Sequence, residues 1–119
     1  MVARIGVDKN GYVLEVSKTG HIQSVYKKSI KDVVASVCEA FPNRVHSLYV
    51  YDSIARGTAK PYKSDIDVTV VLTSPVTFAD EKTFDKLSKK IQRANPILYK
   101  VDFDPGCIKD FLAKRNLYS

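Results

Sequence analysis

The chain is poor in cysteine and has no long apolar run. Its 119 residues include only two cysteines, Cys38 and Cys107, which suggest neither a disulfide framework nor a zinc site. No apolar stretch approaches the roughly 20 residues needed to span a bilayer, and residues 1–6 contain none of signal-peptide length. Internal repeats and low-complexity segments are also lacking. We therefore expect a cytoplasmic protein that does not engage membranes, folded as one domain over residues 1–119.

Acidic residues are the minority among the charged residues. There are 13 Asp and Glu against 19 Lys and Arg, which gives a formal net charge of +6. A positive chain favours anionic partners such as nucleotide phosphates, nucleic acid or acidic protein surfaces. Many of the basic residues fall on expected helices, where a solvated helix face is the simpler explanation. Charge alone does not choose among these partners.

Apolar periodicity and turn residues predict an α+β fold. Residues 3–16 are typical of a β-hairpin, because Asn10 and Gly11 supply turn chemistry between two apolar runs. Helices are expected over residues 24–41 and 80–94, and strands over residues 45–51, 67–72 and 97–103. A short last helix would carry Ile108, Phe111 and Leu112. The expected parts are a hairpin and loop (1–20), a core (24–104) and a C-terminal helix (106–119).

Two aspartates at the start of the 67–72 strand point to metal chemistry. Asp65 and Asp67 are two residues apart, so the period-two pleat would send both carboxylates to one face of the sheet. Neighbouring carboxylates repel each other, and a cation between them lowers that cost. Oxygen ligands on a rigid strand suit Mg²⁺, which takes its remaining ligands from water and phosphates. Two such ions could activate an attacking oxygen and neutralise a leaving group.

A phosphate-binding turn is expected just upstream of these acids. Residues 53–56 predict one turn of helix, with Gly57 as its left-handed stop. The free N–H groups at the start of such a turn could receive phosphate. Combined with the acid pair, this turn predicts a triphosphate site.

The whole segment resembles the nucleotidyltransferase superfamily, whose polymerase-β-like fold includes the aminoglycoside and the small minimal nucleotidyltransferases. The family pattern is Gly-Ser, then Ala-Arg-Gly, then Ser-Asp-Ile-Asp before an apolar strand. Here Ser53, the run Ala55-Arg56-Gly57 and the run Ser64-Asp65-Ile66-Asp67 match it with the spacing kept. The likeness extends over residues 24–104.

This resemblance implies both a fold and an activity. The fold would be a small mixed sheet with helices packed on one face and an N-terminal hairpin. The activity would be an enzyme's transfer of a nucleoside monophosphate, from ATP or another nucleoside triphosphate bound with Mg²⁺, to a hydroxyl of a small molecule, a protein or a nucleic acid. The catalytic and metal-binding carboxylates would be Asp65, Asp67 and a third acid from a later strand. The nucleotide phosphates would lie at positions 52, 53, 56 and 64, which are Asp52, Ser53, Arg56 and Ser64.

The third acid has two candidates, Asp102 and Asp104, which share a face if the strand continues that far. Asp102 is the better candidate because it lies within the β-rich run, whereas Asp104 precedes Pro105 and Gly106 and is also suited to a turn or a helix cap. Such an acid would act as a general base on the incoming hydroxyl or as a metal ligand.

The chain departs from the family pattern in two ways. Asp52 occupies the position of the motif glycine, where it adds bulk and negative charge and, as a favourable N-cap, could satisfy the N–H groups that phosphate needs. Larger members continue into a helical domain that helps bind the acceptor, whereas only residues 108–119 follow the core here, so we expect the acceptor site to come from the hairpin, a second copy of the chain or a partner protein. The alternatives are therefore a non-catalytic nucleotide- or metal-binding relic, and an antitoxin-like minimal nucleotidyltransferase that acts with a protein partner.

Overall fold

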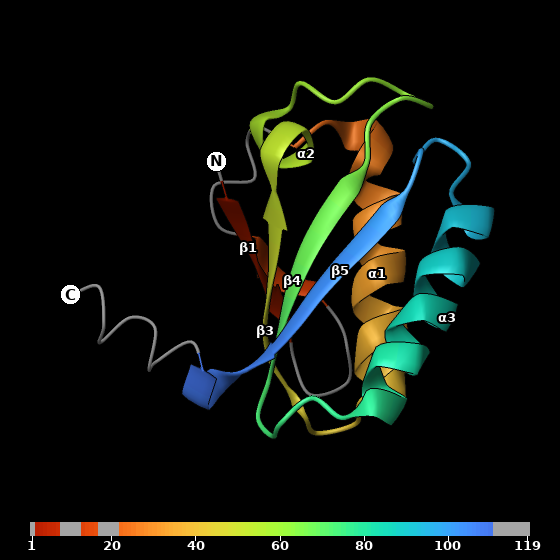
Figure 1. The fold of residues 1–119 in the computed structure, drawn as a ribbon. Helices are drawn as coiled ribbons and strands as arrows, with labels where there is room; N and C mark the ends of the chain where they lie inside the picture. Colours follow the sequence, from red (N-terminus) through yellow and green to blue (C-terminus); the bar gives the residue numbers. More distant parts are fainter. Residues whose placement is uncertain (1, 8–12, 17–21, 111–119) are drawn as a thin grey trace.

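A five-stranded mixed sheet forms the centre of the molecule (Figure 1). The computed structural model describes residues 2–7, 13–16 and 22–110. The strand order is β2-β1-β3-β4-β5. All neighbouring strands are antiparallel except β4 and β5, which are parallel. The strands are β1 (Val2–Val7), β2 (Val13–Val16), β3 (Val45–Tyr51), β4 (Ile66–Leu72) and β5 (Val101–Cys107).

The N-terminal hairpin and the two central strands lie where the sequence predicts them. β1 and β2 pair antiparallel, with Ile5 opposite Val16. The predicted turn around Asn10 and Gly11, and the loop that follows β2, lie outside the described residues. Strand β3 has the predicted bounds, and β4 begins one residue earlier than expected.

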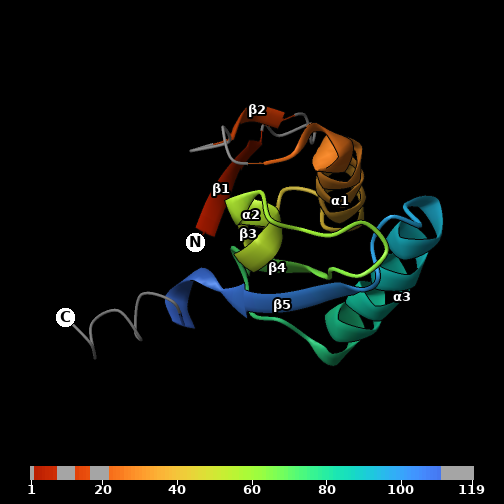
Figure 2. The same cartoon turned by 90° about the horizontal axis from the view of Figure 1, so that it is seen from above.

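Two long helices pack on the same face of the sheet (Figure 2). They are α1 (Lys27–Ala40), preceded by the 3-10 turn η2 (Ser24–Tyr26), and α3 (Phe78–Ala94). The short helix α2 (Asp52–Arg56) follows β3 directly. No helix among the described residues is long and apolar enough to cross a membrane. The predicted mixed sheet with helices on one face is confirmed.

Apolar residues at helical spacing form the core between the sheet and these helices. Helix α1 buries one stripe against the sheet, and α3 buries a shorter one. Phe84 of α3 connects the layers, because its ring stacks on Phe41 with centroids 4.6 Å apart and lies 5.2 Å from the ring of Phe103 on β5. The buried helix residues of this core are Ile30, Val33, Val34, Val37, Phe84, Leu87 and Ile91.

A buried asparagine joins the C-terminal end of α3 to the N-terminal half of α1. The Asn95 side chain is buried, and its Nδ2 donates to the Ile91 carbonyl and to Asp32 Oδ2, both at 2.9 Å. Its Oδ1 accepts from Ser29 Oγ at 3.0 Å and from Lys28 Nζ at 3.2 Å. These bonds satisfy the buried amide and fix where the chain leaves α3.

The last strand differs most from the sequence prediction. Residues 97–103 were expected to be a strand, whereas β5 runs from Val101 to Cys107 and includes Asp104, Pro105 and Gly106. Proline is tolerated there because β5 lies at the edge of the sheet. The predicted C-terminal helix at 106–119 accordingly starts later, with helical conformation at 108–110. The positions of Phe111 and Leu112 are outside the described residues.

Candidate functional site

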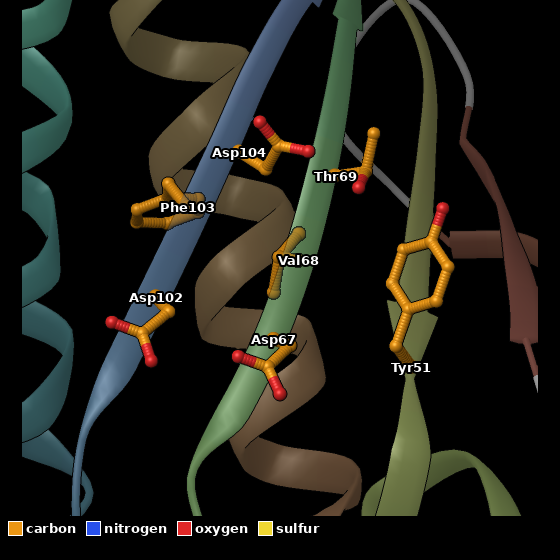
Figure 3. Close-up of a pocket in the computed structure, with 7 residues that line it drawn as sticks. All are labelled: Tyr51, Asp67, Val68, Thr69, Asp102, Phe103 and Asp104. Carbon is orange, nitrogen blue, oxygen red and sulfur yellow. The ribbon is translucent and has the colours of Figure 1, made fainter.

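Two of the predicted carboxylates face each other across the parallel strands. Asp67 on β4 and Asp102 on β5 are register partners, as are the next residues along, Val68 and Phe103. Val68 and Phe103 belong to the helix-covered face, since both pack in or against the core. Because side chains alternate along a strand, Asp67 and Asp102 point to the opposite face, which α1 and α3 do not cover (Figure 3). We call this the open face.

The two aspartates belong to a shallow pocket of about 430 Å³. Tyr51, at the end of β3, lines it on one side, and Thr69 and Asp104 form the next row of side chains along the strands (Figure 3). Asp67 and Asp102 are half-buried, whereas Asp104 is exposed. The pocket thus presents three carboxylates and two hydroxyls over three neighbouring strands, and all of its acidic groups come from β4 and β5.

A lysine that the sequence argument overlooked neutralises one of these acids. Lys100 Nζ lies 3.2 Å from Asp102 Oδ1, in an ion pair open to solvent. The hydrogen bond to Asp102 raises the pKa of Lys100, and the charges of Asp102 and Asp65 act in the same direction. Lys100 precedes the first residue of β5, and a basic residue two positions before Asp102 was the available signal for this ion pair. Tyr51 and Thr69 were also missed, and the alternation of side chains along β3 and β4 is the signal for them.

Asp65 does not join Asp67 and Asp102 in one cluster. It precedes the first residue of β4, and the neighbouring N–H of Ile66 donates to the Lys100 carbonyl at 2.9 Å. Within the part of the chain that the structure describes, no group of three or more His, Cys, Asp or Glu side chains is close enough to hold a metal ion. The structure therefore brings together a pair of the predicted carboxylates, and Asp65 lies beside this pair near the same lysine.

The short helix α2 starts beside the pocket and ends as predicted. Its N-cap is Tyr51, the residue that also lines the pocket, so the expected N-cap position of Asp52 is corrected by one residue. The side chain of Asp52 lies outside the described part of the chain. Gly57 ends the helix in the left-handed region, with φ 78° and ψ 23°, a conformation that glycine adopts without steric cost.

The other predicted phosphate-binding residues lie on or after α2. Ser53 is half-buried, and its carbonyl accepts from the Thr58 N–H at 2.9 Å. Arg56, the last residue of α2, is exposed. Ser64 Oγ accepts from the Lys60 N–H at 2.8 Å, so this hydroxyl closes the loop that leads into β4.

The donor set of the open face suits a hard cation. The carboxylates of Asp67 and Asp102 are register partners on neighbouring strands, and like charges this close repel each other unless a cation lies near them. Mg²⁺ is commonly held by one or two protein carboxylates, with water and substrate phosphates completing its ligands. Asp67 and Asp102 fit that requirement as a pair.

Comparison with known proteins identifies a family for the chain. A family model described as a nucleotidyltransferase domain matches residues 30–106, more than half of the chain, and this span contains β3, α2, β4, α3 and most of β5. No curated protein and no solved structure is significantly similar to the chain. The match covers the Ser53 to Asp67 motif and all three carboxylates of the pocket, and the family predicted from that motif is confirmed. The chain belongs to the nucleotidyltransferase domain family.

Proposed function

We propose that the open face binds a magnesium-bound nucleoside triphosphate and that the chain transfers the nucleoside monophosphate to a hydroxyl acceptor. The observation that carries the proposal is the register pairing of Asp67 with Asp102 in the span that matches the nucleotidyltransferase domain. Bound magnesium would supply positive charge against the phosphates. The protein's contribution would be to position the reactants and their charges, which is how most enzymes of phosphoryl chemistry lower the barrier.

In this proposal three carboxylates at or beside the pocket carry the chemistry. Asp67 and Asp102 hold the cation, and Asp65, which lies near Lys100, is the third carboxylate. When the acceptor oxygen attacks the α-phosphorus, the bond to the pyrophosphate breaks and pyrophosphate leaves. The Asp102 carboxylate accepts the proton that the hydroxyl loses.

The phosphates would lie between the carboxylate pair and the start of α2. Tyr51 supports this direction because it is the residue just before the first turn of α2 and also lines the pocket. Ser53 and Arg56 on α2, and Ser64 in the following loop, are the proposed phosphate contacts. Lys100 adds a positive charge at the edge of the pocket. Because its ion pair with Asp102 is open to solvent, the ammonium group can leave Asp102 and bind a phosphate oxygen instead.

The second candidate function is nucleotide binding without catalysis, by a relic of an active transferase. Asp52 favours it, because a negative charge stands where the family has glycine. The separation of Asp65 from the carboxylate pair favours it as well. In this case the pocket would take the nucleotide or the metal, and the acceptor would play no part.

Calorimetric titration of ATP and GTP, each with magnesium, tests the proposal. The unaltered chain should bind at least one nucleotide, and Asp67→Asn and Asp102→Asn should each lose the magnesium-dependent part of the affinity. Asp65→Asn tests the third carboxylate separately. Asp85→Asn, which changes an exposed aspartate of α3, is the matched control and should bind like the unaltered chain.

Release of pyrophosphate, measured beside this titration, separates the two candidate functions. Binding by the unaltered chain, followed by release of pyrophosphate when hydroxyl acceptors are added, supports the transferase. Binding without release of pyrophosphate, with turnover appearing in Asp52→Gly, assigns the loss of activity to Asp52. If neither the unaltered chain nor Asp52→Gly binds a nucleotide, the proposed site is wrong.

A further inference from the structure

The C-terminal half of α3 and the segment leading into β5 form a basic groove. Two hollows of about 350 and 520 Å³ adjoin there, and both are lined by Lys89 and Arg93. Sharing these two residues makes them one continuous surface that runs from α3 to the start of β5. We define the basic groove by the residues Lys86, Lys89, Lys90, Arg93, Tyr99 and Lys100.

The positive charge of this groove is concentrated on α3. Its four helix residues follow the spacing i, i+3, i+4 and i+7, which places them on one side of α3. No acidic residue occurs between positions 86 and 94. The ion pairs Lys28–Asp32, Arg44–Asp80 and Lys100–Asp102 involve none of these four side chains.

Helix α1 carries a lysine whose hydrogen-bond and ion-pair partners differ from those of the lysines on α3. Lys28 pairs with Asp32 at 2.9 Å, one turn further along the helix. Its Nζ also donates to the Ala94 carbonyl at 3.2 Å. Lys28 of α1 therefore has local partners, whereas Lys86, Lys89 and Lys90 of the basic groove take part in none of the ion pairs found among the described residues.

Hydrogen bonds fix the surface of the groove, and this surface carries an exposed aromatic side chain. Ser88 Oγ donates to the Val101 carbonyl, and Gln92 Nε2 donates to the Leu98 carbonyl at 3.2 Å. These bonds fix the segment before β5 against α3. Tyr99 lies on this segment and is 66% exposed, which leaves its ring open to a stacking partner.

We propose that the basic groove binds single-stranded nucleic acid. Lysine and arginine would neutralise successive phosphates, and the Tyr99 ring would stack on a base, the combination by which proteins bind single strands without reading their sequence. At a rise of about 1.5 Å per residue, the distance from Lys86 to Arg93 along α3 is about 10 Å, enough for more than one phosphate. An acidic protein segment would match the charge and leave the exposed ring unused, so the nucleic acid is the better fit.

The groove ends at the carboxylate pair. Lys100 lines the groove and is also the ion-pair partner of Asp102. A strand bound in the groove would therefore have one end close to the open face. Binding in the groove does not depend on nucleotidyl transfer, and only the use of that end as the hydroxyl acceptor rests on the proposed function.

Fluorescence anisotropy with a labelled oligouridylate, over a series of salt concentrations, tests the groove. Lys89→Gln/Arg93→Gln removes the two residues that line both hollows. Losing two phosphate contacts should lower the slope of log affinity against log salt by about 1.4 and weaken binding about 25-fold at about 0.1 M salt. Tyr99→Ala should weaken binding about tenfold with the slope unchanged.

The control is Lys27→Gln/Lys31→Gln, which removes the same charge from two exposed lysines of α1. Retained affinity in this control supports specific binding in the groove. An equal loss of affinity in both double variants overturns the proposal, because binding would then depend on overall charge. No binding by the unaltered chain overturns it outright. Polyglutamate that competes as well as unlabelled oligouridylate would reassign the groove to an acidic protein.

The outcome is independent of the nucleotide site. Asp67→Asn should bind oligouridylate like the unaltered chain, because Asp67 does not line the groove. Oligouridylate binding without ATP or GTP binding would refute the proposed function and leave the groove intact. Nucleotide binding without oligouridylate binding would refute the groove proposal and leave the proposed function intact.

Discussion

Removing the carboxylate of Asp80 should destabilise the fold strongly. The Asp80 oxygens accept two bonds from the Arg44 guanidinium, at 3.0 and 2.8 Å, and one from the Thr77 N–H at 2.9 Å. This ion pair is mostly buried, with the Asp80 side chain 12% and the Arg44 side chain 30% exposed. Breaking a fully buried pair costs about 3–5 kcal/mol, and because this one is partly open we expect Asp80→Ala to cost about 3 kcal/mol. For a domain of this size that is a fall in Tm of about 12 °C.

The pH dependence of this loss has a definite sign. The bonds from Arg44, and then from the Thr77 backbone, hold the pKa of Asp80 well below its ordinary value. A carboxyl with a depressed folded pKa stabilises the protein above its unfolded pKa of about 3.9, and this stabilisation is lost as the pH falls through the folded pKa. The difference between the unaltered chain and Asp80→Ala should therefore stay constant from neutral pH down to about pH 5 and shrink below about pH 4.

Urea unfolding followed by circular dichroism measures this difference. Asp85→Ala, an exposed aspartate on the same helix, should change the unfolding free energy by less than about 0.5 kcal/mol. Arg44 lies just before β3, and its carbonyl accepts from Thr73 just after β4, whereas Asp67 is near the start of β4. Folded Asp80→Ala should therefore keep its nucleotide affinity. A cost no larger than that of Asp85→Ala, or one that vanishes between pH 7 and pH 5, would refute this reasoning.

Two further predictions concern the site itself. Lys100→Met should raise the affinity for Mg²⁺ severalfold in the absence of nucleotide, because the ammonium competes with a cation for Asp102; calorimetry with MgCl₂ checks this, and an unchanged or lower affinity contradicts it. Gly57→Ala should cost about 1 kcal/mol, seen as a lower Tm, because alanine disfavours the left-handed conformation of Gly57. Gly57→Asn should cost less, and an Ala variant as stable as the unaltered chain would contradict this explanation.

Much of the fold could be predicted because its signals are local. The apolar stripe of α1 recurs with helical period, and those residues pack into the core. Strand β3 has the predicted bounds, and Gly57 has the predicted left-handed conformation. The family likewise follows from a contiguous motif, residues 53–67, that a sequence displays without knowledge of its fold.

The strand that completes the pocket was harder to predict because its position depends on tertiary contacts. Ile97 and Leu98 are apolar and were read as strand, but Leu98 is buried in a turn that follows α3. The parallel pairing starts at Val101 and passes through Pro105, a residue that usually ends a strand. Register between β4 and β5 is set by how α3 returns the chain, so the partnership of Asp67 with Asp102 could not be predicted from spacing.

The predicted metal site combined Asp65 and Asp67, placed together by the pleat of one strand, with a third carboxylate that the family resemblance implies. The rule that places residues two apart on one face holds within a strand, and β4 begins at Ile66, after Asp65. The structure accordingly pairs Asp67 with the acid across the ladder and leaves Asp65 beside Lys100. Lys100 likewise lies just before its strand, since β5 begins at Val101, and its charge two positions before Asp102 was the feature that could have suggested it.

The central claim is that Asp67 and Asp102 hold the metal-bound nucleotide, and paramagnetic broadening of backbone amide signals by Mn²⁺ tests it most directly. Mn²⁺ prefers the same oxygen ligands as Mg²⁺ and broadens the signals of nearby amides. With ATP or GTP present, we expect substoichiometric Mn²⁺ to broaden the signals of Asp67, Thr69 and Asp102 first, to leave that of Asp85 sharp, and to lose this pattern in Asp67→Asn. Broadening centred elsewhere, or unchanged by Asp67→Asn, would contradict the account.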